Sequence, residues 1–338
     1  MTPDRFDFLT QRYSSLTLAL LGDFCLDRYF DIDPNASEIS IETGLPVHNI
    51  FRVRCLPGAA GTILNNLAAL GVGRIRCIGI RGDDGEGFEL QRALTARSGA
   101  DLDGFITVQG RHTFTYTKPL LHRQDHPPEE LSRLDLKNTT PTPAVTEAAV
   151  ISSIDAAEAD AQAWIVLDQV DLTGTGVITA SVLDRLNSLA RRNPALPILV
   201  DSRRGLRGWP KVVWKMNAAE LERLSGRSLG TFSAILDAAG EMAASNQQPV
   251  FITLAELGII GANPRGVAVH VPAFPVNGPI DIVGAGDSVS ANLTLALAAG
   301  ASLEEAMEMA MAAAHLVIHQ LGTTGTASIT QIRKCLFG

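Results

Sequence analysis

The stretch DIVGAGDSVSANLTLALAAG, residues 281–300, places three residues of almost bare backbone directly before a helical pattern. Gly284, Ala285 and Gly286 leave the N–H groups at the start of that helix clear of bulky side chains. Free N–H groups at a helix start bind anions with the help of the helix dipole, and glycine lets a phosphate approach them closely. The stretch therefore predicts an anion site at the mouth of a helix.

Asp287 follows this glycine-rich turn and allows two interpretations. As a structural residue it is the N-cap of the helix. As a functional residue it takes a proton from a hydroxyl group while the neighbouring N–H groups stabilise a phosphoryl group in transfer. General-base catalysis is worth about 10²–10⁴-fold and one anion-hole donor about 10²–10³-fold, so the functional interpretation predicts phosphoryl-transfer chemistry.

Outward from this stretch, short apolar runs alternate with helical patterns along the chain. Strands that alternate with helices form a mostly parallel sheet covered on both faces, so the sequence predicts an α/β fold. We expect buried strands at 16–21, 75–80, 164–167, 198–200, 212–216 and 250–254, and helices at 62–70, 87–97, 180–192 and 232–245.

Two segments, 28–56 and 105–137, depart from this rhythm because their polar and apolar residues alternate. Alternation indicates strands with one solvent-exposed face, so these segments predict a small separate sheet or flap. Within the second, HRQDHPPEE (122–130) is expected to form an exposed loop.

Polar residues end or follow several of the predicted strands. Because ligands gather at the carboxyl ends of strands in a parallel sheet, these residues predict a polar cleft along one edge. They are Asp23, Asp168, Asp201, Asn217 and Thr253.

Composition limits the partners of the chain. Its 338 residues carry a net charge of −8, and no run of Lys or Arg exceeds two residues, which argues against nucleic acid or a membrane surface as partner. No apolar run approaches the ~18 residues that span a bilayer. The four cysteines lack metal-site spacing and the N-terminus lacks a signal-peptide pattern, so we expect a soluble cytoplasmic protein with reduced thiols.

DIVGAGDS resembles the D-x-x-G-A-G-D signature of the ribokinase-like (phosphofructokinase B type) carbohydrate kinases. The resemblance spans nearly the whole chain and implies one ribokinase-like domain over 1–338, a three-layer α/β/α fold, and a β-sheet lid that often also forms a homodimer interface. The other blocks that carry it, in family order, are GDFCLD (22–27), PGAAGTILNNLAALG (57–71), IGIRGDDGEGFEL (78–90), KMNAAEL (215–221), ITLAELGIIG (252–261) and AAAHLVIHQLGTTG (312–325).

The resemblance implies a role for each matching residue. Asp287 matches the catalytic base, and Gly284, Ala285 and Gly286 match the anion hole. Glu220 would arrange Mg²⁺, largely through water, which suits a cation that prefers oxygen ligands. A monovalent cation is a further cofactor that the family allows. The residues implied to bind the acceptor sugar are Asp27, Gly58, Ala59 and Thr62, and those implied to bind ATP are Asn217, Glu220, Thr253, Gly258 and Gly322.

Other residues near these motifs are weaker candidates. Asp23 is a further possible sugar ligand or a structural residue. Arg203 and Arg204 fit either a phosphate contact or an ordinary basic turn. His315 and His319 are expected to lie on a helix face without a chemical role.

Within the family, blocks such as LGDFCLDRYF (21–30) and ISIETGLPVHNI (39–50) resemble the kinases that phosphorylate D-glycero-β-D-manno-heptose 7-phosphate at O1. Those kinases are often fused to a nucleotidyltransferase domain, and we expect none within these 338 residues. Two departures leave the acceptor open: the family's Gly-Gly-x-x-Asn reads Gly58-Ala59-Ala60-Gly61-Thr62, and Thr175 replaces a lysine.

The alternatives are therefore a kinase for another sugar or a nucleoside, and a non-catalytic sugar or nucleotide sensor on a kinase fold. An NAD-binding or nucleotide-sugar enzyme is disfavoured because no G-x-G-x-x-G follows the first predicted strand.

Overall fold

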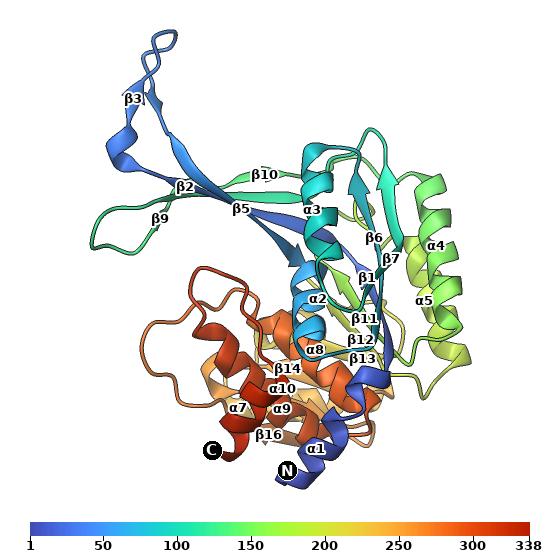
Figure 1. The fold of residues 1–338 in the computed structure, drawn as a ribbon. Coiled ribbons are helices and arrows are strands. Elements are labelled where there is room, and N and C mark those ends of the chain that lie inside the picture. Colours follow the sequence, from blue (N-terminus) through green and yellow to red (C-terminus); the bar gives the residue numbers. More distant parts are fainter.

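The computed structural model describes residues 1–338, and its middle layer is a nine-stranded sheet (Figure 1). The strand order is β16-β15-β14-β13-β12-β11-β1-β6-β7. Strands β14 to β7 in this order are parallel, and β15 and β16 run antiparallel at one edge. The prediction of a mostly parallel α/β sheet is confirmed. The strands are β1 (Thr17–Gly22), β6 (Arg74–Gly82), β7 (Ala100–Val108), β11 (Ala163–Asp168), β12 (Ile198–Ser202), β13 (Val213–Asn217), β14 (Val250–Thr253), β15 (Ile259–Ala262) and β16 (Ala268–Val271).

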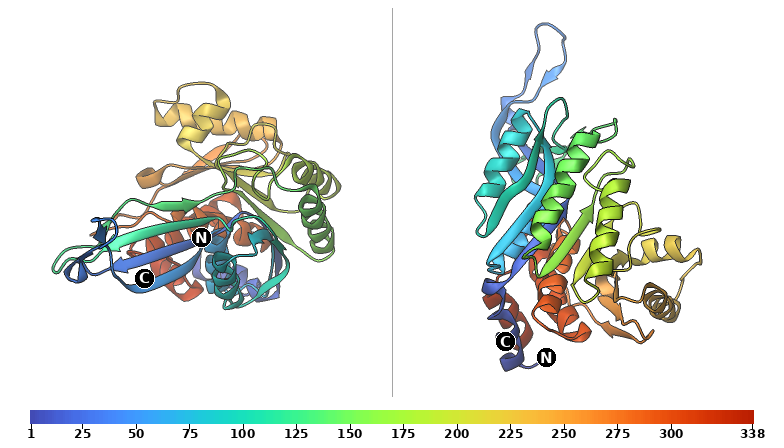
Figure 2. Two further views of the ribbon diagram at one scale, coloured as in Figure 1. Left: turned by 90° about the horizontal axis from the view of Figure 1, so that it is seen from above. Right: turned by 90° about the vertical axis from the view of Figure 1, so that its right-hand side faces the viewer.

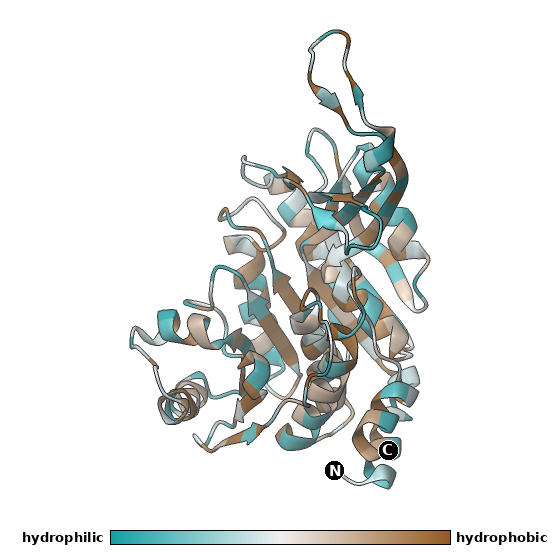
Figure 3. Ribbon diagram, turned by 90° about the vertical axis from the view of Figure 1, so that its left-hand side faces the viewer, coloured by the Kyte–Doolittle hydropathy of each residue, from teal (hydrophilic) through white to brown (hydrophobic).

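Helices cover both faces of this sheet (Figure 2). Successive strand residues point to opposite faces, so in β1 Leu18 and Leu20 join one apolar cluster while Ala19 and Leu21 join the other. Figure 3 shows the apolar strands lying between the two helical layers. One layer holds α1 (Pro3–Thr10), α2 (Ala60–Ala69), α3 (Gly85–Thr95), α8 (Ala285–Ala298), α9 (Leu303–Ile318) and α10 (Ile329–Phe337), and the other α4 (Ala144–Glu158), α5 (Ala180–Arg192), α6 (Ala218–Ser225) and α7 (Phe232–Asn246).

A second sheet extends away from the main body and forms the lid (Figure 1). Its order is β10-β8-β2-β5, with β9 added to β8 and the β3–β4 pair at its tip. The strands are β2 (Phe24–Ile32), β3 (Glu38–Ile39), β4 (Pro46–Val47), β5 (Ile50–Ala59), β8 (Thr115–Leu121), β9 (Glu129–Glu130) and β10 (Leu134–Leu136).

The lid strands differ in extent from the segments 28–56 and 105–137 that their alternation indicated. Strands β2 and β5 together begin at Phe24 and end at Ala59. Residues 105–108 belong to the main sheet, because β7 continues its pairing with β6 as far as Val108. Residues 123–130 are exposed, as expected for that loop.

The strand order reverses at β1. From there the chain first adds β6 and β7 on one side, and then returns to add β11 on the other side. In open α/β sheets ligands bind outside the carboxyl ends of the strands at this point. Asp23 follows β1, Asp168 ends β11, and Asn217 lies beside Thr253 at the ends of β13 and β14. The lid begins with β2 directly after β1, so it leaves the sheet at the same place. No helix of the chain combines the length and apolar character needed to cross a membrane.

Candidate active site

The N-cap position of α8 is occupied by a glycine, Gly284. Gly284 is the N-cap of the helix and has φ +83°, a conformation that glycine adopts without strain. A β-carbon at this position would lie 3.2 Å from Thr62 Cγ2 and 3.3 Å from Thr324 Cβ. The backbone conformation and the close packing of the two threonines therefore both favour glycine here.

Three amides at the start of α8 have no hydrogen-bond acceptor in the protein. The N–H groups of Gly284, Gly286 and Asp287 make no backbone hydrogen bond, whereas that of Ala285 donates to the carbonyl of Ile282 at 3.2 Å. The donors available to the expected anion site are thus the amides on either side of Ala285. Unsatisfied N–H groups at a helix start are the donors that bind phosphate.

The carboxylate of Asp287 does not cap the helix. Asp287 is the third residue of α8, and the N-cap Gly284 has no side chain, so the interpretation of Asp287 as the N-cap is wrong. Burial raises the pKa of Asp287 to about 7, with Lys215 lowering it and Asp201 raising it. A carboxyl with a pKa near neutrality is suited to accept a proton and to release it again.

Lys215 lies beside this carboxylate, and the sequence analysis did not find it. Its Nζ is 2.5 Å from Asp201 Oδ2, and it would lie 3.6 Å from a β-carbon placed on Gly286. Burial favours the neutral amine, but Asp201, Asp287 and Glu220 raise the pKa of Lys215, so it is charged. The available signal was a lysine within the buried run VVWKM at the carboxyl end of a strand.

The helix α6 begins with a second acid that is bonded differently. Asn217 is its N-cap and accepts from the N–H of Glu220 at 2.9 Å, while Glu220 Oε2 accepts from the N–H of Asn217 at 2.8 Å. This reciprocal pair is a capping box. Burial raises the pKa of Glu220, and its Oε1 has only a distant cation, the Arg223 guanidinium at 3.9 Å.

The protein has no preformed cluster of metal-ligating side chains. No group of three or more His, Cys, Asp or Glu residues is placed to hold a metal ion. The free Oε1 of Glu220 fits a cation that takes most of its ligands from phosphates and water, which is how Mg²⁺ is commonly held.

Asp27 lies on β2, a strand of the lid, and is buried. Burial raises the pKa of Asp27, and Lys118, whose Nζ is 3.8 Å from Oδ1, opposes this. A β-carbon on Gly58 would lie 2.5 Å from Asp27 Oδ2 and 2.7 Å from Cys25 Sγ. Gly58 therefore makes room for the carboxylate that the resemblance assigns to sugar hydroxyls.

Ala59 and Thr62, the two residues that differ from the family's Gly-Gly-x-x-Asn motif, have structural consequences. Ala59 adopts φ +53° and ψ −120°, a region that residues with a β-carbon rarely occupy. The hydroxyl of Thr62 donates to the carbonyl of Pro57 at 3.4 Å, and its methyl group packs near Gly284. Thr62 thus supports the turn and the anion site, and its hydroxyl is not free for an acceptor.

The face of the lid that carries Asp27 is rich in cations. Tyr29 follows Asp27 on the same face of β2, because alternate strand residues share a face. The Arg54 guanidinium lies 4.6 Å and the Lys118 ammonium 5.0 Å from the centre of the Tyr29 ring. Tyr116 on the neighbouring strand β8 is paired with Asp27, and the Arg133 guanidinium lies 5.0 Å from the centre of the Tyr116 ring.

One lid arginine also contacts the C-terminal part of the chain. Arg54 donates through Nη1 to the carbonyl of Gly322 at 3.2 Å, and Asp31 holds the same guanidinium at 3.0 and 3.1 Å. The N–H of Gly322 donates to Asp281 Oδ2 at 3.1 Å. Gly322 therefore connects the lid to the residues that precede α8.

The other residues implied to bind ATP make mainly backbone interactions. Thr253 ends β14, and its hydroxyl lies 3.5 Å from the carbonyl of Met216. Gly258 has φ +98°, and a β-carbon there would lie 2.2 Å from the carbonyl of Val271, so only glycine fits. The rings of His315, on α9, and His319, its C-cap, meet edge to face with centroids 4.7 Å apart.

Several charged candidates have structural roles instead. Asp23 accepts from the N–H groups of Gln169, Val170 and Val177, which fixes the loop after β11. Arg204 forms an internal ion pair with Asp168 at 2.9 Å, so it is not free to reach a phosphate.

The remaining basic residue of that turn stays a candidate for a phosphate contact, whereas the threonine that replaces the family lysine is used in a turn. Arg203 is half-exposed and 3.8 Å from Asp171. The Thr175 hydroxyl donates to the carbonyl of Leu172 at 2.9 Å and closes a turn.

Comparison with known sequences finds one family match and several similar proteins. The profile of the pfkB family carbohydrate kinases matches residues 182–330. The chain is 33% identical over 314 residues to the bifunctional protein HldE of Azorhizobium caulinodans, covering 90% of this chain and 61% of that protein. It is 30% identical over 338 residues to HldE of Bradyrhizobium diazoefficiens, covering 98% and 65%. The chain thus spans less than two thirds of these relatives.

Solved structures share the fold at lower identity. Ribokinase of Arabidopsis thaliana, complexed with ribose and ATP, aligns with a TM-score of 0.69 and 19% identity over 96% of this chain and 99% of that one. Phosphofructokinase-2 of Escherichia coli, in complex with potassium, aligns with a TM-score of 0.69 and 19% identity over 95% and 98%. The expected ribokinase-like α/β fold is confirmed.

Proposed function

Because residues 182–330 match the model of the pfkB family carbohydrate kinases, we propose that the chain transfers the terminal phosphoryl group of ATP to a sugar hydroxyl, with Asp287 as the general base. The observation that carries this proposal is the geometry at the start of α8. There a carboxylate with a pKa of about 7, not used in capping, stands among amides without acceptors.

The proposed step moves one proton and one phosphoryl group. The Asp287 carboxylate takes the proton from the acceptor hydroxyl while that oxygen forms a bond to the γ-phosphorus. The bond between the γ-phosphorus and the oxygen bridging to the β-phosphate breaks, and ADP leaves with that oxygen's electron pair. The amides of Gly284, Gly286 and Asp287 would stabilise the charge on the phosphoryl oxygens in transfer.

Lys215 would supply the positive charge that this step needs. It is buried, charged and directed toward Gly286, so a phosphoryl group bound at the amides would lie within reach of its ammonium. Mg²⁺, when bound, neutralises phosphate charge, and Glu220 would hold it through water while Asn217 fixes the orientation of Glu220. Thr253, Gly258 and Gly322 would border the nucleotide.

The acceptor that we propose is D-glycero-β-D-manno-heptose 7-phosphate, phosphorylated at O1, on the strength of the sequence blocks described above. Asp27 would bind its hydroxyls beside Gly58, with Ala59 and Thr62 shaping the turn. An anionic acceptor is supported by the lid, where Lys118 and Arg54 surround Tyr29 close to Asp27. These cations would take the place of the lysine that Thr175 replaces.

The lid would also pair with the lid of a second copy. Its surface exposes several large apolar side chains, and pairing would remove their apolar area from water. They are Ile39, Ile41, Leu45, Ile50, Phe51, Val53 and Leu134. Light scattering of the purified protein should give twice the chain mass, and Phe51→Asp should give the mass of one chain. A monomeric wild-type protein would refute the pairing.

A coupled assay of ADP release tests the function. The chain with ATP and Mg²⁺ should release ADP with the heptose phosphate, and more slowly or not at all with unphosphorylated heptose, pentoses, hexoses and nucleosides. Release with another acceptor only would move the assignment to that sugar. A protein that binds a sugar or nucleotide calorimetrically but releases no ADP with any acceptor would be a sensor, and the kinase proposal would be wrong.

A further inference from the structure

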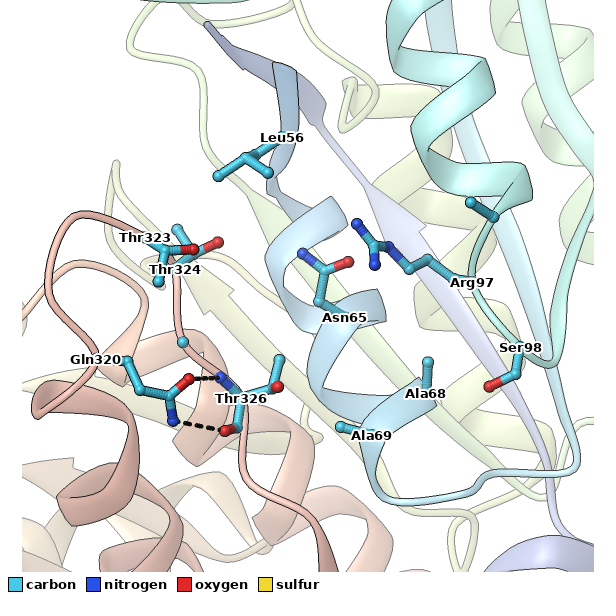
Figure 4. Close-up of a pocket in the computed structure, with 12 residues that line it drawn as sticks. Leu56, Asn65, Ala68, Ala69, Arg97, Ser98, Gln320, Thr323, Thr324 and Thr326 are labelled. Atoms are coloured by element: carbon cyan, nitrogen blue, oxygen red, sulfur yellow. Dashed lines mark hydrogen bonds between the residues drawn. The ribbon is translucent and has the colours of Figure 1, made fainter. Parts of the chain in front are cut away.

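A pocket outside the proposed chemistry lies between α2, the end of α3 and the loop 320–326 (Figure 4). Its volume is about 530 Å³, within the roughly 300–1,000 Å³ of small-molecule sites. None of the residues to which we assign phosphoryl transfer, metal or acceptor binding lines it. The pocket is therefore large enough for one small ligand of its own.

The charge of this pocket is opposite to that of the whole chain. The protein has a net charge of −8, yet the pocket is lined by one arginine, Arg97, and by no aspartate or glutamate. The Arg97 guanidinium takes part in no ion pair, and its Nε is buried without a hydrogen-bond partner. Buried donors are nearly always paired, so an unpaired guanidinium in an acid-free pocket indicates an anionic ligand.

Neutral polar groups complete the lining. Asn65 Oδ1 is also buried without a partner, and Figure 4 shows the Arg97 guanidinium directed toward the Asn65 amide. Thr323 and Thr324 lie on the other side of α2, and Ala68 adds a small apolar surface. A guanidinium beside an amide, with hydroxyls across α2, suits a phosphate ester of a polyol, because phosphate pairs with arginine and the neutral groups pair with hydroxyls.

The loop that forms one wall is held in shape without a ligand. Gln320 donates through Nε2 to the carbonyl of Thr326 at 2.7 Å and accepts from the N–H of Thr326 at 3.2 Å. Figure 4 shows these two bonds closing the loop. The pocket is thus preformed, which lowers the entropy lost on binding.

This wall also touches the anion site of α8. Thr324 lines the pocket, and its Cβ lies 3.3 Å from the position of a β-carbon on Gly284. On the opposite wall, Asn65 follows Thr62 by one turn of α2, and Thr62 packs against the same glycine. A ligand that shifts either wall therefore shifts the amides at the start of α8.

We propose that this pocket binds a small phosphate ester, with Arg97 pairing its phosphate, and that its occupancy changes the affinity of the catalytic cleft for nucleotide. The binding part stands independently of the chain's activity. The coupling part rests on the proposed function, because it requires a nucleotide at α8. Coupling between two sites is reciprocal, so it can be measured from either ligand.

Calorimetric titration with ribose 5-phosphate, inorganic phosphate and ribose tests the binding, with ADP and Mg²⁺ present to fill the catalytic cleft. Ribose 5-phosphate should bind the wild type, and Arg97→Gln should weaken it at least about tenfold. Arg92→Gln is the matched control, because Arg92 lies on α3, five residues before Arg97, and is exposed and paired with Glu89. Ala68→Leu should weaken binding by filling the pocket while keeping the charge.

The proposal is overturned if neither phosphate compound binds the wild type, if Arg97→Gln binds as tightly as the wild type, or if ribose binds as well as its phosphate. For the coupling, saturating ribose 5-phosphate should change the affinity for ADP at least about threefold in the wild type and in Arg92→Gln, but not in Arg97→Gln. An unchanged ADP affinity refutes the effector role. Failure of ADP to bind at all refutes the proposed function instead, and the ribose 5-phosphate titration still decides the pocket.

Discussion

Two helices of this protein, α6 and α8, begin at the same edge of the sheet and carry an acid at the same helical position, but the acids are bonded differently. Glu220 is the third residue of α6 and is tied back to the N-cap Asn217 in a capping box. Asp287 is the third residue of α8, and the N-cap Gly284 has no side chain to pair with it.

The difference lies in the N-cap residue. An asparagine at the cap satisfies the amide of the third residue and orders the acid, so the helix end stabilises itself. A glycine at the cap leaves both the amides and the acid unsatisfied, so the end of α8 loses stability but gains groups that can bind and react. We interpret α6 as the positioning end and α8 as the reacting end.

The strongest test removes each acid in turn. Asp287→Asn should lower kcat at least about 10²-fold with little change in stability, because it removes the proton acceptor alone. Glu220→Gln should lower kcat less than about tenfold, because glutamine also completes a capping box. Steady-state kinetics of both variants measures the two losses of kcat. Equal losses would mean that the two acids do not differ in role.

Lys215→Met should lower kcat by about 10²-fold, since it removes the charge beside the anion site. Because Lys215 lowers the pKa of Asp287, the variant should need a higher pH to ionise that base. In the wild type, kcat/KM should fall as pH drops through about 7, and in the variant this fall should begin at higher pH.

Lys215→Arg serves as the control because it keeps the charge, and it should retain the pH profile of the wild type. A wild-type profile in Lys215→Met would show that the lysine only supports Asp201.

Gly284→Ala and Gly286→Ala separate conformation from access. Alanine at 284 must adopt a positive φ and press on Thr62 and Thr324, so we expect a loss of about 1–3 kcal/mol in the free energy of unfolding. Gly286 meets only Lys215 Nζ at 3.6 Å, so its variant should keep its stability and instead raise KM for ATP. Urea unfolding and steady-state kinetics measure the two effects, and equal destabilisation of both variants would contradict this separation.

Asn217→Ala tests the capping box at α6. Loss of an N-cap side chain costs about 0.5–2 kcal/mol, so the urea midpoint should fall accordingly. The freed Glu220 should then bind Mg²⁺·ATP less well, seen as a raised KM. An unchanged midpoint would mean that the box adds no stability to this end of the helix.

Ala59→Gly should have the smallest effect and the opposite sign. The strain of a β-carbon at φ +53° is of order 1–3 kcal/mol, and glycine costs about 0.4–1 kcal/mol through the unfolded chain. These two terms differ by about 0 to 2.6 kcal/mol in favour of glycine, so the variant should be more stable by about 1 kcal/mol in thermal unfolding. A lower Tm would show that the surrounding contacts remove the strain.

The strands of the core could be predicted because they are buried on both faces. Continuous apolar runs such as WIVL (164–167) and VFITL (250–254) have one physical explanation in a chain of this type, and each became a strand of the main sheet. Strand β7 was assigned to the lid in part, because an edge strand is half-exposed and ADLDGFITV (100–108) alternates like a flap. Periodicity reports exposure, not which sheet a strand joins.

The candidate site was predictable where the chemistry is local in sequence. Gly284 to Asp287 lie within four residues, and the capping spacing Asn217-x-x-Glu220 is equally visible. The pairing of Arg204 with Asp168, 36 residues away, depends on strands β11 and β12 lying side by side, so no spacing predicts it. The role of Lys215 required knowing that β13 ends beside the start of α8.

The bond from Arg54 to Gly322 has a consequence for the order in which ligands arrive. It joins the sheet that carries Asp27 to a loop whose amide donates to Asp281, four residues before the first residue of the helix that would bind the nucleotide. A swing of the lid must either break this bond or pull that loop with it. We therefore expect the two substrates to bind with synergy, and Arg54→Ala, which removes the guanidinium, to lose that synergy.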